Sequence, residues 1–88
     1  MRFEKVKGGK VTTKKDYEEI FADDNKAKIQ RIRNVNIQNM GKEDINVIIN
    51  DGDEIILQAD EVISLGDVLV GSIVIKEKGS IVRYIGVE

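Results

Sequence analysis

Short apolar runs separated by Gly, Asp and Asn turns fill the chain from residue 34 to residue 88. Ile45, Val47 and Ile49 recur at every second position, which is typical of a half-buried β-strand. The segment Asn50–Asp53 reads as a tight turn, because Asp-Gly suits the positive φ angles of a type I′ hairpin. The whole pattern predicts strands over residues 27–39, 45–50, 54–57, 61–65, 72–76 and 80–86.

These strands predict a mainly β fold, a small six- to seven-stranded antiparallel sandwich or partly open barrel with one short N-terminal helix. In the strand 27–39 the early isoleucines are out of register with Val35 and Ile37, so we expect a β-bulge near Arg31–Arg33. The last two strands are expected to form a terminal hairpin around residues 77–79. The predicted core consists of Val35, Ile37, Val47, Ile49, Ile55, Leu57, Ile63, Ile73, Ile75, Val82 and Tyr84.

The N-terminal residues follow a different pattern. Gly8-Gly9 should break any strand that starts near residue 2, and Thr13 with Asp16 gives a helix-start signal. A helix over 14–22 would place Tyr17, Ile20 and Phe21 on one apolar stripe. We therefore expect residues 1–25 to be an arm with a short helix and residues 26–88 to be the β-domain, within a single domain overall.

Charge is unevenly distributed along the 88 residues, although the net charge is only −2. Residues 1–15 and 26–33 are basic, whereas residues 16–25 and 34–72 are acidic. Such segregation favours head-to-tail contact between copies, although ordinary solvated faces would give the same pattern. The N-terminus lacks the apolar segment of a secretion signal, and no apolar run is long enough to span a membrane.

Candidate chemistry is sparse, because the chain contains no His and no Cys. The acidic turn at residues 50–54 lacks the spacing of a calcium loop, so we read it as a hairpin turn. The serines have no histidine to activate them. The segment 8–13 lacks the full pattern of a phosphate-binding loop. We therefore predict no catalytic, cofactor-binding or metal-binding residues, and no enzyme activity.

Six segments carry a resemblance to a known class of protein: 35–39, 46–52, 56–57, 60–65, 72–75 and 80–86. Their order of short strands and turns resembles the small β-sandwich modules in virion structural proteins of tailed bacteriophages and prophages. The resemblance covers residues 32–88 and rests on a pattern of strands, not on a catalytic signature. It implies a head, neck or tail component that works by self-assembly, and it carries over no catalytic residues.

The resemblance and the last strand, which is apolar on both faces, lead us to expect a homo-oligomer that also contacts other virion proteins. Its location would be the virion, after synthesis in the host cytoplasm. The alternative is a small monomeric β-domain that binds nucleic acid, carbohydrate or another protein. An acidic pI of about 5.2 and few aromatic rings argue against nucleic acid. The predicted interface residues are Tyr17, Ile20, Phe21, Lys26, Lys28, Arg31, Arg33, Ile81, Arg83 and Ile85.

Overall fold

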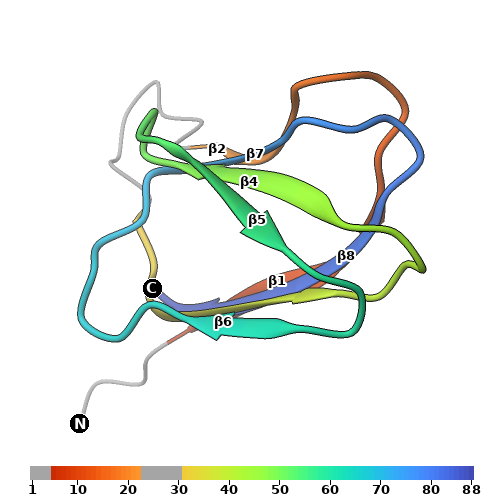
Figure 1. Cartoon of the computed structure of the whole chain (residues 1–88). Coiled ribbons are helices and arrows are strands. Elements are labelled where there is room, and N and C mark those ends of the chain that lie inside the picture. Colours follow the sequence, from red (N-terminus) through yellow and green to blue (C-terminus); the bar gives the residue numbers. More distant parts are fainter. Residues whose placement is uncertain (1–4, 23–30) are drawn as a thin grey trace, which may run out of the picture.

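Two antiparallel sheets of four strands face each other in the computed structural model, which describes residues 5–22 and 31–88 (Figure 1). One sheet has the order β1-β8-β3-β6 and the other the order β2-β7-β4-β5. The strands are β1 Val6–Thr12, β2 Glu18–Ala22, β3 Arg33–Asn39, β4 Ile45–Ile49, β5 Glu54–Leu57, β6 Val62–Ser64, β7 Ser72–Ile75 and β8 Ile81–Val87. The mainly β expectation is confirmed, but the strand number is wrong, and neither sheet closes into a barrel. The described ranges contain no helix long and apolar enough to cross a membrane.

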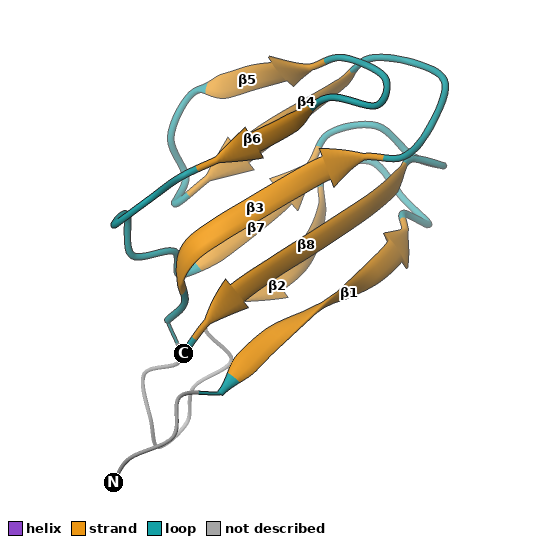
Figure 2. Ribbon diagram, turned by 90° about the horizontal axis from the view of Figure 1, so that it is seen from below, coloured by secondary structure: helices purple, strands orange, loops and turns teal. Residues whose placement is uncertain are grey.

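The strand order is that of a jelly roll. Strand β1 pairs with β8, β2 with β7, β3 with β6 and β4 with β5. All four pairs are antiparallel and each is nested in sequence within the one before it. Figure 2 shows β8 lying between β1 and β3 in one layer. Among the described strands, only β4 and β5 are both consecutive and hydrogen-bonded. The expected terminal hairpin is therefore wrong, because β7 and β8 belong to different sheets.

The predicted N-terminal helix is also wrong, because the segment forms strand β2. Tyr17 has a left-handed backbone (φ 54°), which a helix cannot accommodate. A register shift between Glu19 and Phe21 then bulges the strand. The bulge turns both Ile20 and Phe21 toward the core. A bulged strand thus buries a cluster of side chains whose spacing resembles the stripe of a helix.

Strand β1 runs through the two glycines that were expected to break it, in continuous register with β8. A Cβ atom at Gly8 would overlap the carbonyl oxygen of Tyr84, whereas a Cβ atom at Gly9 would meet nothing within 4 Å. Gly8 is therefore needed for the close approach of the two strands, and Gly9 is not. Residues 6–12, expected to belong to an arm, are part of the same sheet as the C-terminal strand.

A bulge is present in β3, between Arg33 and Asn36, slightly later than predicted. Asn34 has a left-handed backbone (φ 51°), and its N–H donates to the Gly66 carbonyl oxygen at 2.8 Å. The extra residue lets Ile32 and Val35 both point into the core, although they are three positions apart. The bulge in β3 therefore explains the mismatch in apolar spacing seen in the sequence.

The core lies between the two sheets and is built almost entirely from aliphatic side chains. Predicted residues Val35, Ile37, Val47, Leu57, Ile73, Ile75 and Val82 are buried, as are the unpredicted Ile32, Ile45 and Val70. Ile49, Ile63 and Tyr84 are partly buried. Ile55 is 43% exposed, because it lies on the edge strand β5 where the facing sheet covers it incompletely. The rings of Phe21 and Tyr84 join the two sheets, with centroids 5.9 Å apart.

The β4–β5 hairpin is confirmed, but its turn is centred one residue earlier than predicted. The Gly52 N–H donates to the Ile49 carbonyl oxygen at 2.9 Å. The two central residues are Asn50 and Asp51, with φ angles of 52° and 57°. Two successive left-handed residues define a type I′ turn. Asn and Asp tolerate this conformation better than other side chains with a Cβ atom.

The two adjacent glycines provide a matched test of the β1–β8 pairing. We expect Gly8→Ala to lower the free energy of unfolding by about 1–3 kcal/mol, because the new methyl group must displace β8. Gly9→Ala should change it by no more than about 1 kcal/mol, since it adds a methyl group in open space. Urea unfolding followed by circular dichroism measures both. Equal effects at the two positions would contradict this pairing geometry.

Candidate interaction surface

The outward side of the sheet β1-β8-β3-β6 is a broad surface that we call the β8 face (Figure 2). The strand register places Lys10, Arg83, Gln38 and Val62 in one row across it. The next row includes Ile85, which is 40% exposed, and shallow hollows border Ile85 and Arg83 on both sides. The charged residues of these four strands are all basic. The β8 face therefore combines positive charge with exposed aliphatic groups.

The outward side of the sheet β2-β7-β4-β5, which we call the β4 face, is formed by strands that carry acidic residues instead. Its register aligns Glu19, Val74, Ile48 and Glu54 in one row. The charged residues of these four strands are all acidic. Beyond the end of β7, the Lys76 Nζ lies 3.1 Å from a Glu54 carboxylate oxygen. The hydrogen bond and charge of Glu54, with further attraction from Tyr17 and Glu77, raise the pKa of Lys76.

An apolar stripe accompanies these acidic groups on the β4 face. Val74 and Ile48 are half-buried neighbours, and Ile56 on the edge strand β5 is 63% exposed. Both outer faces of the molecule thus present aliphatic side chains to solvent within charged surroundings. Such patches on a small soluble domain mark candidate contact surfaces.

The structure divides the predicted interface residues among several places. Ile81, Arg83 and Ile85 lie on the β8 face, and Arg33 lies at the end of the same face. Because antiparallel partners share a face, the outward assignment of these residues follows from the register. The predicted interface residues of the last strand therefore share one outward face, and their part in an interface stays a prediction.

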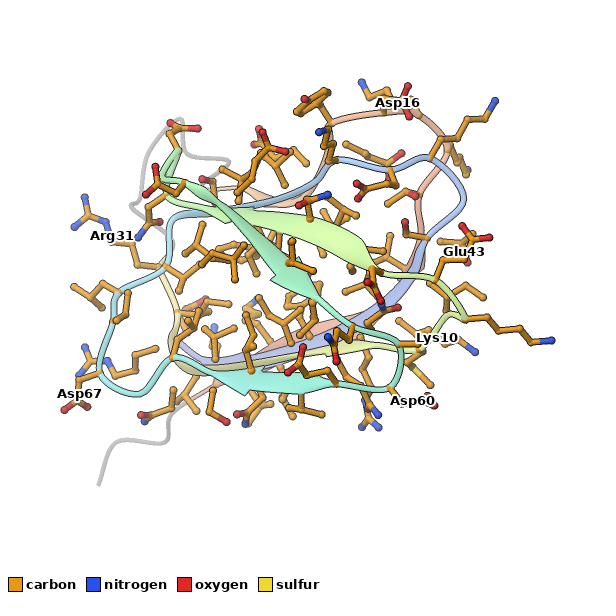
Figure 3. All side chains as sticks on the ribbon, viewed as in Figure 1. Lys10, Asp16, Arg31, Glu43, Asp60 and Asp67 are labelled. Atoms are coloured by element: carbon orange, nitrogen blue, oxygen red, sulfur yellow. The ribbon has the colours of Figure 1, made fainter. Side chains whose placement is uncertain are left out.

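The other predicted residues do not join this surface. Ile20 and Phe21 are partly buried and pack against the core, and their part in an interface stays a prediction. Tyr17 is exposed in the loop beside Asp16, at the opposite end of the molecule from Arg31 (Figure 3). Lys26 and Lys28 lie outside the described residues.

A hollow of about 410 Å³ lies between the loops 40–44 and 76–80, at the end of the molecule marked by Asp16, Glu43 and Asp60 in Figure 3. Its polar groups are engaged in holding the loops. The buried Asn39 side chain donates to the carbonyl oxygens of Glu43 (2.7 Å) and Leu57 (3.0 Å) and accepts from the Gly41 N–H (3.0 Å). Asn39 thus ties the β3–β4 loop to strand β5.

The loop 76–80 is fixed by a second polar network. Both carboxylate oxygens of Glu77 accept from Asn46, one from its backbone N–H (2.8 Å) and one from its side chain (2.6 Å). The buried hydroxyl of Thr13 donates to the Glu77 carbonyl oxygen (2.7 Å) and accepts from the Ser80 N–H (2.8 Å). These groups satisfy one another across two loops and strand β4, so the network stabilises this end of the fold.

The polar side chains of the described residues are engaged mainly in holding the fold together. Among residues 5–22 and 31–88, no three acidic side chains gather closely enough to hold a metal ion. No buried side-chain nitrogen or oxygen in these ranges lacks a hydrogen-bond partner. Comparisons with protein-family models, curated proteins and solved structures give no match to the chain. The outer faces and edges of the sheets are therefore its best candidate functional surfaces.

Sequence reasoning missed the contribution of β1 and β6 to the β8 face. Val6 and Lys10 lie there because β1 continues through Gly8-Gly9, which had been read as a break. Val62 joins them because β6 pairs with β3. These two strands are not consecutive in the chain, so the local sequence pattern does not reveal their pairing. The segment Val6–Thr12 has no apolar alternation that could have identified β1, because its inward positions are Lys7, Gly9 and Val11.

Asn39 provides a test of the loop network, with Asn36 on the same strand as a matched control. We expect Asn39→Ala to lower the free energy of unfolding by at least about 2 kcal/mol, because it leaves buried backbone groups without partners. Asn36→Ala should cost less than about 1 kcal/mol, since the exposed Asn36 side chain bonds only the Ser64 hydroxyl among the described residues. Thermal unfolding curves that shift equally for the two variants would contradict this role of Asn39.

Proposed function

We propose that the chain is a non-catalytic structural module that assembles with copies of itself, as a head, neck or tail component of a tailed-phage particle. The observation that carries the proposal is the separation of charge between the two outer faces. The strands of the β8 face have only basic charged residues, and those of the β4 face have only acidic ones. Each face also exposes aliphatic side chains.

Opposite charges on opposite faces favour stacking of one copy's β8 face on the next copy's β4 face. A contact between two different surfaces of the same protein is heterologous. Repeated copies of such a contact build a ring if the rotation closes and a filament if it does not. This geometry suits a component of a large symmetric particle.

The fold adds a weaker form of support. Jelly rolls occur in viral capsid domains, but also in lectins and cupins, so the architecture alone does not select a function. The pattern-level resemblance to phage virion proteins points in the same direction as the capsid use of this fold. The engagement of Asn39, Glu77 and Thr13 in loop stabilisation is consistent with a non-catalytic role.

Light scattering coupled to size exclusion tests self-association. At about 50 mM salt we expect particles larger than the 9.9 kDa monomer, growing with protein concentration. Stacked faces should separate as salt screens their charges over a Debye length of about 4 Å at 0.5 M. Arg83→Glu should reduce stacking, whereas Lys42→Glu in the exposed loop 40–44 should not. A 9.9 kDa monomer at every concentration and salt would contradict self-association.

A second candidate function is binding of single-stranded nucleic acid on the β8 face. It is favoured by Lys10, Arg33 and Arg83 on a surface whose strands have no acidic residue. Affinity for a 15-nucleotide oligothymidylate, measured by fluorescence anisotropy, should then fall roughly tenfold to twentyfold between 50 and 200 mM salt. Arg83→Ala should weaken it further. Binding that is absent, or equal for wild type and Arg83→Ala, would remove this candidate.

A further inference from the structure

The four sheet edges differ in how well they are protected against pairing with another chain. Strand β2 is bulged, β5 has four residues and β6 has three. Short strands, bulges and lysine side chains are usual means of preventing edge-to-edge association, and of these β1 has only Lys7 and Lys10. Strand β1 has seven residues and keeps an unbroken register with β8. It is therefore the long, regular edge within the described part of the chain.

Two hydrogen bonds at the ends of the β1–β8 ladder show which β1 backbone groups bond β8 and which point away from it. The Glu88 N–H donates to the Lys5 carbonyl oxygen at 2.8 Å, and the Thr13 N–H donates to the Ser80 carbonyl oxygen at 2.8 Å. Antiparallel ladders alternate between hydrogen-bonded and non-hydrogen-bonded pairs. The odd-numbered residues from 5 to 13 therefore bond β8. The backbone groups of the even-numbered residues from 6 to 12 point toward the open edge.

We propose that β1 pairs in an antiparallel manner with β1 of a second copy, which joins the two sheets into one continuous sheet. This inference rests on the proposed self-association and names a contact that forms it. Pairing all seven residues places the two-fold axis at Gly9. Val6 then lies opposite Thr12 of the second copy, and Gly8 lies opposite Lys10.

This register satisfies the free backbone groups of both copies. Even-numbered residues meet even-numbered residues, so each outward N–H finds an outward carbonyl oxygen. A slip of one residue would place the outward N–H and carbonyl groups of one copy opposite residues of the other copy whose backbone groups already bond β8. Main-chain pairing of this kind is how exposed sheet edges commonly take up an added strand.

The side chains of β1 fit the same register. Lys7 lies opposite Val11 of the second copy and Lys10 lies opposite Gly8, so no lysine faces a lysine directly. A slip of two residues in one direction would place Lys10 opposite Lys10, and like charges in that position are destabilising. A slip of two residues in either direction also leaves two residues at one end of each β1 strand unpaired.

Salt should affect this contact differently from face stacking. Lys10 is the register partner of Arg83, and the two-fold axis brings the Lys10 residues of both copies into diagonal positions. Positive charges therefore converge on the β8 face of the joined sheet. Salt screens their repulsion, so the edge-paired dimer should persist in 0.5 M salt, where stacked faces separate.

Single cysteines test the register directly, because the chain has no native cysteine. At the two-fold axis the Gly9 residues form a non-hydrogen-bonded pair, with Cα atoms about 4.5 Å apart, which is within disulfide range. Gly9→Cys has room for its side chain and should give a disulfide-linked dimer under mild oxidation. Thr12→Cys is exposed on the same strand, but its two copies would lie about 20 Å apart.

We expect Gly9→Cys to cross-link at least tenfold faster than Thr12→Cys. Equal rates, or no cross-linking of Gly9→Cys at concentrations where the wild type is oligomeric, would overturn the proposed register.

A proline at position 10 tests the hydrogen bonds of the edge. The Lys10 N–H points away from β8, so Lys10→Pro removes a bond to the second copy without removing one within the sheet. Sedimentation in 0.5 M salt should show at least tenfold weaker dimerisation for Lys10→Pro. The control Lys10→Ala, which keeps the N–H and removes a repelling charge, should dimerise as well as the wild type or better.

Circular dichroism verifies that Lys10→Pro and Lys10→Ala fold. If Lys10→Pro does not fold, the comparison of Gly9→Cys with Thr12→Cys still tests the pairing of β1. A wild type that stays monomeric under all conditions contradicts self-association as a whole. A wild-type dimer that Lys10→Pro leaves unchanged contradicts only the pairing of β1.

Discussion

The pairing of β8 with both β1 and β3 is the interaction on which the rest of the structure depends. It brings the two ends of the chain together and places the last strand inside a sheet. Without β8, strand β1 would have no partner in its sheet, and the pair β3–β6 would be separated from it. Loop-closure entropy makes such long-range contacts costly until many of them form together.

Much of the local structure could be predicted from the sequence. Strand β4 follows from apolar residues at every second position, and β5 from the short apolar run after the Asn-Asp-Gly turn signal, which are short-range features. The apolar mismatch in β3 correctly indicated a bulge. The two faces of β8 were also correct, because the alternation of a strand does not depend on its partners.

The sheet topology and the N-terminal strands could not be predicted in the same way. The pairing of β1 with β8 joins residues more than sixty positions apart, and no local pattern specifies it. The spacing of Ile20 and Phe21 fits a helix and a bulged strand equally well. The left-handed turn at Tyr17 and the partnership with β7 select the strand.

The outer faces and the open edge of β1 suggest two different contacts in one module. The proposed face stacking would be driven by opposite charges and would extend to rings or filaments, whereas the proposed edge pairing is symmetric and would end at a dimer. A module with both contacts could assemble from dimers. The glycines of β1 serve this arrangement in two ways. Gly8 allows the close approach to β8, and Gly9 leaves open space at the edge.

Amide hydrogen exchange along β1, resolved by residue with NMR at low and high protein concentration, tests the central claim most directly. At low concentration the amides of Lys7, Gly9 and Val11 should be protected, while those of Gly8, Lys10 and Thr12 should exchange rapidly. At high concentration the second group should gain protection and the first should change little. Protection of all these amides in the dilute monomer, or no gain by the second group at high concentration, would contradict the account.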